Sequence, residues 1–190
     1  MRGKGFTVWF TGLPCSGKST LSKRLHQHLK ELGYPAEILD GDEVRKRLTK
    51  GLDFSRDGRN ENVRRIAYVA NLISRVGGVA ITAAISPYAA LRADARKEIS
   101  NFIEVYVNCP LEVCIERDVK GHYAKAKRGE IQNFTGISDP YEPPTKPEVV
   151  VQTNVESPDE SIKKIVEYLA KSRYIEEEAV RRNNKDNSMM

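Results

Sequence analysis

The sequence predicts an α/β fold in which a five-stranded parallel sheet is flanked by helices. Five short runs of apolar, largely β-branched residues recur along the chain, and amphipathic segments with helical spacing separate them. Continuous apolar character is typical of short strands that are buried on both faces, as in a parallel sheet covered by helices. A glycine-rich stretch, GLPCSGKST (residues 12–20), lies directly between the first run and the first amphipathic segment.

Each predicted strand is short and is bounded by polar or turn-forming residues. In chain order the strands cover residues 6–11, 36–39, 78–84, 102–108 and 148–153. Apolar residues at helical spacing predict helices from Leu21 to Leu32, from Val63 to Ser74 and from Ile162 to Leu169. ESPDES, just before the last of these, supplies cap-type residues and an early proline, which favour a helix start.

The length of 190 residues suits one domain with a full core. We assign residues 1–172 to this domain. Within it, residues 118–147 carry glycines, prolines and basic residues without a buried strand, and a loop this long in a compact domain is typical of a lid. Residues 173–190 are strongly polar, which predicts a disordered tail without a function of its own.

Composition excludes several other classes of protein. No apolar run approaches the roughly 18 residues that a membrane span needs, and the first ten residues lack a signal-peptide pattern, so we expect a soluble, cytoplasmic protein without a membrane partner. The three cysteines have neither metal-site nor redox spacing, which predicts free thiols. The net charge of +5 suits an anionic ligand but is also common on ordinary surfaces.

GLPCSGKST matches the P-loop spacing G-x-x-x-x-G-K-[ST] between a strand and a helix. Gly12 and Gly17 let the backbone approach a phosphate closely, and the following helix directs its positive end at that phosphate. In this motif Lys18 reaches the β- and γ-phosphates, and the hydroxyl of Ser19 ligates Mg²⁺. The sequence therefore predicts ATP with Mg²⁺. A guanine-reading NKxD has only one candidate, NNKD at 183–186, and it lies in the tail rather than after a strand.

Further polar residues follow the second and third predicted strands. Asp40 and Asp42 come at the sheet edge where α/β proteins bind ligands, with Arg45 one helical turn later. Either carboxylate could hold metal through water or accept a proton from an attacking hydroxyl, although one of them could instead cap a helix that starts near Glu43. Ser86 of AISPY lies at the same edge, where a Ser-Pro pair could also merely end the strand.

Arginines are concentrated in FSRDGRNENVRR (residues 54–65). Their planar guanidinium groups suit phosphate or sulfate, whereas a charge run of this kind also occurs on solvated helix faces.

Six segments together resemble the adenylylsulfate kinase (APS kinase) family in order and spacing. They are GLPCSGKST, LDGDEVR, FSRDGRNENVRR, ISPY, PLEVCIERDVKGHYAKAKRGEIQNFTGI and DPYEPP, and the resemblance spans about residues 5–172. It implies a P-loop NTPase-type kinase that uses MgATP to phosphorylate the 3′-hydroxyl of adenosine 5′-phosphosulfate. The products would be 3′-phosphoadenosine 5′-phosphosulfate and ADP, formed during sulfate assimilation.

The resemblance also implies roles for individual residues. On the acceptor side, Phe54 and Phe134 would sandwich the adenine, as aromatic faces do well. The other implied acceptor-binding residues are Asp42, Arg45, Arg59, Asn62, Ile85, Ser86, Lys120 and Asn133. The implied ATP-binding residues are Gly12, Cys15, Ser16, Gly17, Lys18, Ser19, Thr20, Thr153 and Glu156. The implied catalytic set is Lys18, Asp42, Asp40 and Ser86.

The chain departs from the family pattern in a few places. Gly58 stands where an acidic residue commonly precedes the arginine that matches Arg59, and Pro14 and Cys15 stand where small residues are usual. The short start resembles the kinase portion of a fusion with ATP sulfurylase. The family further implies a homodimer, with ATP and adenylylsulfate as small-molecule partners and no nucleic acid.

Two mechanisms follow for the transfer. We favour direct transfer, in which Asp42 orients or deprotonates the acceptor hydroxyl and Asp40 contacts the metal through water, although these two roles could be exchanged. Relatives are often described as passing through a phosphoserine at the position of Ser86. No His or Lys beside Ser86 in the sequence suggests a base that would activate it.

The sequence leaves two other functions open. A P-loop kinase for another small hydroxyl compound should not need both Phe54 and Phe134, and a nucleotide-binding regulator without turnover should not need Lys18, Ser19, Asp40 and Asp42.

Overall fold

Five parallel strands form one sheet in the computed structural model, which describes residues 4–176. The strands are β1 (Phe6–Thr11), β2 (Ala36–Asp40), β3 (Val79–Ala83), β4 (Phe102–Asn108) and β5 (Val149–Gln152), in the order β2-β3-β1-β4-β5. All five predicted strands and the parallel sheet are confirmed, with ends that differ from the prediction by one residue at most.

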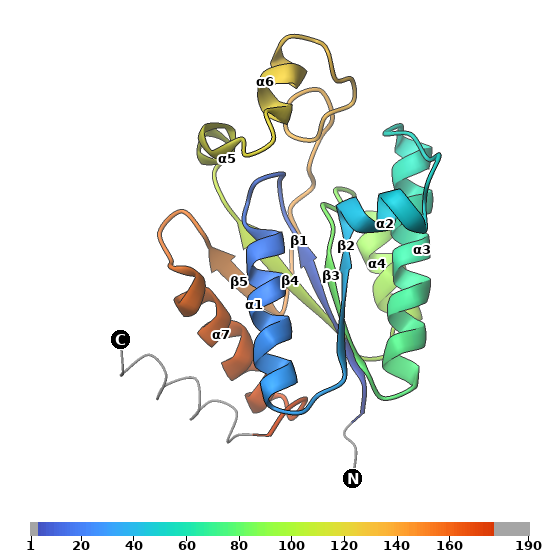
Figure 1. The fold of residues 1–190 in the computed structure, drawn as a ribbon, viewed down its shortest axis with the longest axis vertical. Helices are drawn as coiled ribbons and strands as arrows, with labels where there is room; N and C mark the ends of the chain where they lie inside the picture. Colours follow the sequence, from blue (N-terminus) through green and yellow to red (C-terminus); the bar gives the residue numbers. More distant parts are fainter. Residues whose placement is uncertain (1–3, 177–190) are drawn as a thin grey trace.

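Helices cover both faces of this sheet (Figure 1). α1 (Lys18–Glu31) and α7 (Pro158–Lys171) pack on one face, and α3 (Arg56–Arg75) and α4 (Ala89–Glu98) pack on the other. The apolar spacing that predicted α1, α3 and α7 is the face that each helix buries: Leu25, Ile66 and Ile165 are each 0% exposed. At the start of α7, Ser157 and Glu160 form a reciprocal capping box, which explains why the helix begins there.

Three shorter helices lie at the carboxyl ends of the strands. α2 (Gly41–Arg47) follows β2 directly, and α5 (Leu111–Arg117) and α6 (His122–Lys127) follow β4. Figure 1 shows α5 and α6 above the sheet, at the end where β1 leads into α1. The predicted lid therefore contains a helix, α6, whose Tyr123 is fully buried against Cys109 and Cys114. Within residues 4–176 no helix is long and apolar enough to cross a membrane.

The packed chain continues past the predicted domain boundary at residue 172. Ile175 is 4% exposed within the core that α1 and α7 share, and the ring of Tyr174 lies 5.3 Å from that of Phe6. The first residues of the predicted polar tail thus belong to the domain. The rest of that tail, residues 177–190, including NNKD, lies outside the described residues.

We expect Ile175→Ala to destabilise the fold by about 2–4 kcal/mol, because it removes buried methyl groups and leaves a cavity. Urea unfolding measures the change. Val155→Ala, at a side chain that is 71% exposed, is the control and should change the free energy of unfolding little. Equal midpoints for the two variants would show that the segment after α7 contributes nothing to the core.

Candidate functional site

The loop between β1 and α1 has a backbone that requires glycine. Gly12 has φ +154°, and a Cβ atom at this position would lie 2.5 Å from the carbonyl oxygen of Val107 on β4. Gly17 has φ +103° and immediately precedes α1. Both glycines of the predicted P-loop are therefore needed for the turn itself, which directs the start of α1 toward the space above β1.

Lys18 lies inside this loop and is 7% exposed. Its Nζ donates to the carbonyl oxygens of Gly12 (2.9 Å) and Leu13 (2.6 Å). These partners are neutral, and burial lowers the pKa of Lys18 to about 8. A phosphate in the loop would supply the negative charge that the carbonyls lack, so the ammonium is placed to favour an anion there.

Ser19 and Asp40 form a pair of oxygen ligands beside the loop. Ser19 Oγ donates to Asp40 Oδ2 at 2.9 Å, and Asp40 Oδ1 accepts from the backbone N–H groups of Asp42 and Glu43. Asp40 thus caps α2, which confirms that one of the two aspartates is a helix cap. Its second oxygen still faces Ser19.

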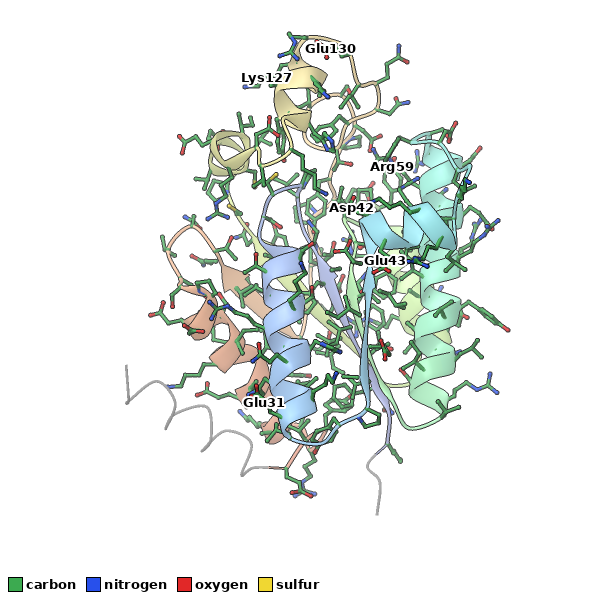
Figure 2. The ribbon with its side chains drawn as sticks, in the orientation of Figure 1. Glu31, Asp42, Glu43, Arg59, Lys127 and Glu130 are labelled. Atoms are coloured by element: carbon green, nitrogen blue, oxygen red, sulfur yellow. The ribbon has the colours of Figure 1, made fainter. Side chains whose placement is uncertain are left out.

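Asp42 is exposed and makes a different contact, an ion pair with Lys120 of the lid. The hydrogen bond to Asp42 raises the pKa of Lys120, which keeps the ammonium charged. Figure 2 shows Asp42 and Arg59 at the same end of the sheet, below Lys127 and Glu130 of the lid, with Glu31 at the far end. The lid therefore meets the α2 carboxylate that sequence analysis assigned to the acceptor.

The two aromatic rings assigned to the acceptor are held in different surroundings. Phe54 is 53% exposed, and the guanidinium of Arg45 lies 4.3 Å from its ring centroid. Phe134 is half-buried, and its ring lies edge-on to that of Tyr123 at 5.0 Å. A neighbouring side chain thus holds each ring: Arg45 lies over a face of Phe54, and Tyr123 packs edge-on against Phe134.

Arg59 connects the segments that carry these two rings. Its Nε donates to the carbonyl oxygen of Phe54 (3.0 Å), its Nη1 donates to Thr135 Oγ1 (2.8 Å), and its Nη2 donates to the carbonyl oxygen of Asn133. Arg59 is 6% exposed, so its donors are used within the protein. Its position explains how two aromatic residues far apart in sequence come to the same side of the site.

Three other predicted acceptor residues lie on α3 (Asn62) and shortly after the end of β3 (Ile85 and Ser86). Asn62 is buried and accepts from Thr49 Oγ1 at 2.8 Å. The carbonyl oxygen of Ile85 accepts from Thr11 Oγ1 at 2.8 Å. Ser86 is 2% exposed, has φ +40°, and its Oγ accepts from Trp9 Nε1 at 3.0 Å. The Ser86 hydroxyl is therefore used in a buried hydrogen bond.

The predicted donor-side residues divide into two groups. Thr153 Oγ1 donates to the carbonyl oxygen of Ser16 at 2.7 Å, which joins the end of β5 to the P-loop. Glu156 instead binds its own neighbourhood, accepting from the N–H of Gln152 (2.9 Å) and from Lys164 Nζ (2.7 Å). The structure thus brings Thr153 to the loop but uses the Glu156 carboxylate to hold the turn before α7.

Sequence reasoning missed two arginines of this region. Arg117, the last residue of α5, donates to the carbonyl oxygen of Thr153 at 2.6 Å and contacts the carbonyl oxygen of Cys15 at 3.5 Å. Arg92 of α4 donates to the carbonyl oxygen of Ser86 at 2.7 Å. Arg92 lies outside every quoted segment, and Arg117 lies within the segment of residues 110–137 that resembles the family but was given no role there, so only the tertiary packing shows that both reach the site.

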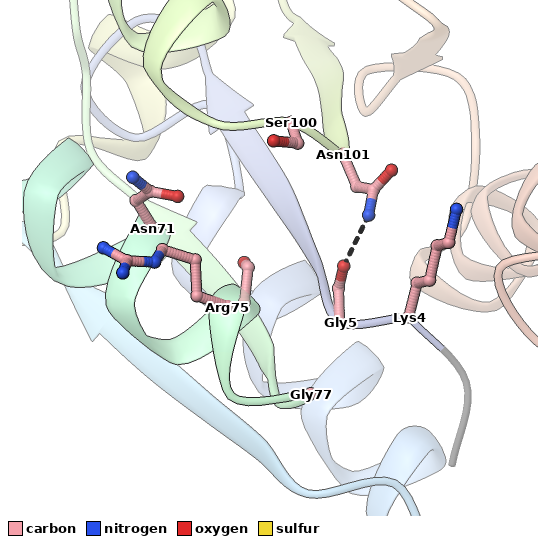
Figure 3. A pocket seen from close by; sticks show the side chains of 8 residues that line it. Lys4, Gly5, Asn71, Arg75, Gly77, Ser100 and Asn101 are labelled. Atoms are coloured by element: carbon pink, nitrogen blue, oxygen red, sulfur yellow. Dashed lines mark hydrogen bonds between the residues drawn. The ribbon is translucent and has the colours of Figure 1, made fainter. Parts of the chain in front are cut away.

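A separate cavity of about 340 Å³ lies at the other end of the sheet, where β1 begins (Figure 3). Its lining includes Lys4, Asn71, Arg75 and Asn101, and Asn101 Nδ2 donates to the carbonyl oxygen of Gly5 at 2.8 Å. None of the predicted site residues lines it, so we place the chemistry at the P-loop end.

Comparison with known proteins decides the family. The family model for adenylylsulphate kinase matches residues 4–152. The chain belongs to this family. A probable adenylyl-sulfate kinase of Synechocystis sp. is 52% identical over 176 residues, which are 93% of this chain and 99% of the relative.

Solved structures agree with this assignment. An APS kinase of Mycobacterium tuberculosis, in complex with AMPPNP and APS, superposes with a TM-score of 0.84 at 43% identity and covers 88% of this chain and 98% of its own. A hexameric APS kinase of Thiobacillus denitrificans superposes with a TM-score of 0.71 at 35% identity over 92% of this chain and 30% of its own.

We expect Lys18→Ala to lower the rate of phosphoryl transfer by about 100-fold or more, because it removes the charge that stabilises the transferred group. Steady-state rates, with circular dichroism to check the fold, measure this. Lys23→Ala removes one charge from an exposed position on the same helix and should retain the activity of the unmodified protein. Full activity in Lys18→Ala would remove the P-loop lysine from the mechanism.

Proposed function

We propose that this chain transfers the γ-phosphoryl group of ATP to the 3′-hydroxyl of adenosine 5′-phosphosulfate, giving 3′-phosphoadenosine 5′-phosphosulfate and ADP. The observation that carries this proposal is that the chain has, besides the P-loop, a second region with two aromatic rings, Phe54 and Phe134. Arg59 joins the two segments that bear these rings. Family membership supports the same reaction.

The acceptor would bind between the two aromatic rings. Phe54 and Phe134 offer faces on which an adenine can stack, and Arg45 beside Phe54 brings a cation toward the phosphosulfate. Asn133, next to Phe134, has its backbone in the left-handed region at φ +53° and completes this rim. Because Arg59, Asn62 and the Ile85 carbonyl already bind protein groups, we assign them mainly to shaping the acceptor subsite.

The ATP phosphates would bind in the P-loop, wrapped by Cys15, Ser16 and Thr20 with Gly12 and Gly17 at the turns. Lys18 supplies the charge that meets the phosphates from within the loop. Thr153 and Arg117 support the loop from β5 and α5, at the side where the base would lie. Glu156 contributes there by holding the turn after β5.

Mg²⁺ would be held by Ser19 directly and by Asp40 through water. The hydroxyl and the carboxylate lie 2.9 Å apart at the mouth of the loop, and such oxygen ligands suit this ion. Within the described residues no group of three or more His, Cys, Asp and Glu side chains could hold a metal. Magnesium in kinase sites keeps several waters and substrate oxygens, so two protein ligands are enough. When bound, the ion neutralises charge on the β- and γ-phosphates.

Asp42 is our choice for the group that orients or deprotonates the acceptor hydroxyl. Its carboxylate does not cap α2, since Asp40 has that role, and it faces the lid through Lys120. Ser86 is less suited to a covalent step, because its hydroxyl is buried against Trp9 and no His or Lys hydrogen-bonds to it within residues 4–176. We therefore propose direct transfer, with closure of the lid excluding water.

We also propose a cytoplasmic homodimer with ATP and adenylylsulfate as its small-molecule partners. Size-exclusion chromatography with light scattering tests the assembly.

The test of function is ADP release from ATP, coupled to a spectrophotometric readout, with and without adenylylsulfate. Release that depends on adenylylsulfate supports the proposal. Release that depends instead on another small alcohol would indicate a different P-loop kinase, and ATP binding without release would indicate a regulator.

Phe134→Ala should weaken adenylylsulfate binding by about 1–3 kcal/mol and ATP binding much less, because only the acceptor base stacks on this ring. Calorimetric dissociation constants for the two nucleotides measure the difference. Tyr68→Ala removes an aromatic ring that is 59% exposed on α3 and should change neither constant. An equal loss for both nucleotides in Phe134→Ala would contradict the stacking assignment.

Ser86→Ala should keep substantial activity, whereas Asp42→Asn should be the more damaging change, because it removes the carboxylate from the attacking hydroxyl. The serine variant loses one buried hydrogen bond to Trp9 and should therefore also be somewhat less stable. Rates of product formation compare the two variants. Incubation with γ-labelled ATP alone provides a second test: a label on Ser86 that passes to adenylylsulfate at the rate of turnover would refute direct transfer.

A further inference from the structure

Arg92 joins two segments of the acceptor side, ISPY (85–88) and DPYEPP (139–144). These segments are more than 50 residues apart in the sequence. Its side chain is 3% exposed. Nη1 donates to the carbonyl oxygen of Ser86 at 2.7 Å, and Nη2 donates to the carbonyl oxygen of Glu142 at 2.6 Å. Because the guanidinium is planar and rigid, these two bonds hold the segments at a set separation.

The third contact of Arg92 fixes the guanidinium to the sheet. Nε donates to Glu104 Oε1 on β4 at 2.8 Å, and Glu104 is itself 6% exposed. A buried guanidinium without a carboxylate partner would be strongly disfavoured, so this pair is what permits a cation at this depth. Arg96 Nη2 also donates to the second carboxylate oxygen of Glu104, Oε2, at 3.2 Å. The ion pair with Glu104 on β4 therefore fixes the position of Arg92.

Residues 139–142, which we call the strap, make further bonds to the same neighbourhood. Tyr141 OH lies 3.0 Å from Thr11 Oγ1, which in turn donates to the Ile85 carbonyl oxygen. Burial raises the pKa of Tyr141, so its hydroxyl stays protonated. Glu142 Oε2 accepts from the N–H of Ala89 at 2.7 Å, which caps the start of α4 with a negative charge.

The other end of the strap reaches the loop that carries Phe134. The carbonyl oxygen of Asp139 accepts from the N–H of Gly136 at 2.8 Å, and the Asp139 carboxylate accepts from Tyr88 OH at 3.0 Å. Asp139 Oδ2 also lies 3.9 Å from Arg59 Nε. A continuous set of bonded groups thus runs from Arg92 through the strap to the backbone of the loop that carries Phe134, the ring assigned to the acceptor adenine.

We propose that Arg92 is a positioning residue that sets the geometry of the acceptor subsite while leaving the ATP subsite unaffected. This inference rests on the proposed function. None of the hydrogen bonds of Arg92 within the described residues goes to residues 12–20. Loss of its geometry should therefore change adenylylsulfate binding selectively.

Arg92→Lys tests the proposal, because lysine keeps a charge beside Glu104 but its single ammonium cannot span Glu104, Ser86 and Glu142 together. We expect the KM and the calorimetric Kd for adenylylsulfate to rise about tenfold or more, as for the loss of one or two charge-assisted hydrogen bonds, with the values for ATP changing less than about twofold. Arg96→Lys is the matched control. It lies on the same helix and binds the same Glu104, but contacts neither Ser86 nor Glu142, so it should lower the melting temperature without changing either KM.

Several outcomes would overturn the proposal. It fails if Arg92→Lys leaves adenylylsulfate binding within twofold, if both substrates weaken equally, or if Arg96→Lys gives the same selective loss. Should Arg92→Lys not fold, Tyr141→Phe decides: it removes only the strap hydroxyl and should raise the KM for adenylylsulfate selectively, and an unchanged KM would refute the role of the strap. The unmodified protein is measured in the same assay, so absence of adenylylsulfate turnover there would contradict the proposed function instead.

Discussion

The site depends on one constraint, the pairing of β1 with a parallel strand on each side. Phe10 of β1 is in register with Ala83 of β3 and with Val105 of β4, and Val8, Trp9 and Phe10 are fully buried. A shift of register by one residue would turn each of these side chains to the opposite face, so the end of β1 is held in one place. The chain leaves β1 at Gly12, between the ends of its two neighbours, and this is the crevice in which α/β proteins bind phosphate.

The buried arginines and the buried lysine around this crevice differ in the acceptors of their hydrogen bonds. Arg59 and Arg92 are buried with three acceptors each, so their guanidinium groups serve to hold segments together. Lys18 has only neutral carbonyl partners for its ammonium at short distance, and its lowered pKa reflects that burial without a counter-ion. Among residues 4–176, Lys18 is thus the one buried cation without a carboxylate within ion-pair distance, and it is the one that we assign to the ATP phosphates.

The lid contacts both halves of the site. Tyr123 OH donates to the carbonyl oxygen of Pro14 in the P-loop at 3.0 Å, and Lys120 pairs with Asp42 on α2. Phe134 then follows on the return segment, packed against Tyr123. Because the donor loop, the α2 carboxylate and the acceptor ring all contact one segment, movement of that segment would affect both nucleotides together. This arrangement suits a reaction in which water must be kept from ATP until the acceptor is in place.

Local pattern was enough to predict the strands, the main helices and the P-loop, because each depends on residues that are close in sequence: apolar periodicity for burial, and two glycines, Lys18 and Ser19 at set spacing for the phosphate turn. Other predictions depended on resemblance, such as the roles of Phe54 and Phe134. Pattern could not say which of Asp40 and Asp42 caps α2, nor that Ser86 Oγ is buried against Trp9, nor that Tyr174 and Ile175 pack into the core. Pattern assigned no role to Arg92 or Arg117, since the acceptors that tie them to the site include backbone carbonyls from distant segments and any residue supplies a carbonyl. Contacts of that kind have no sequence signature, and only the folded chain brings donor and acceptor together.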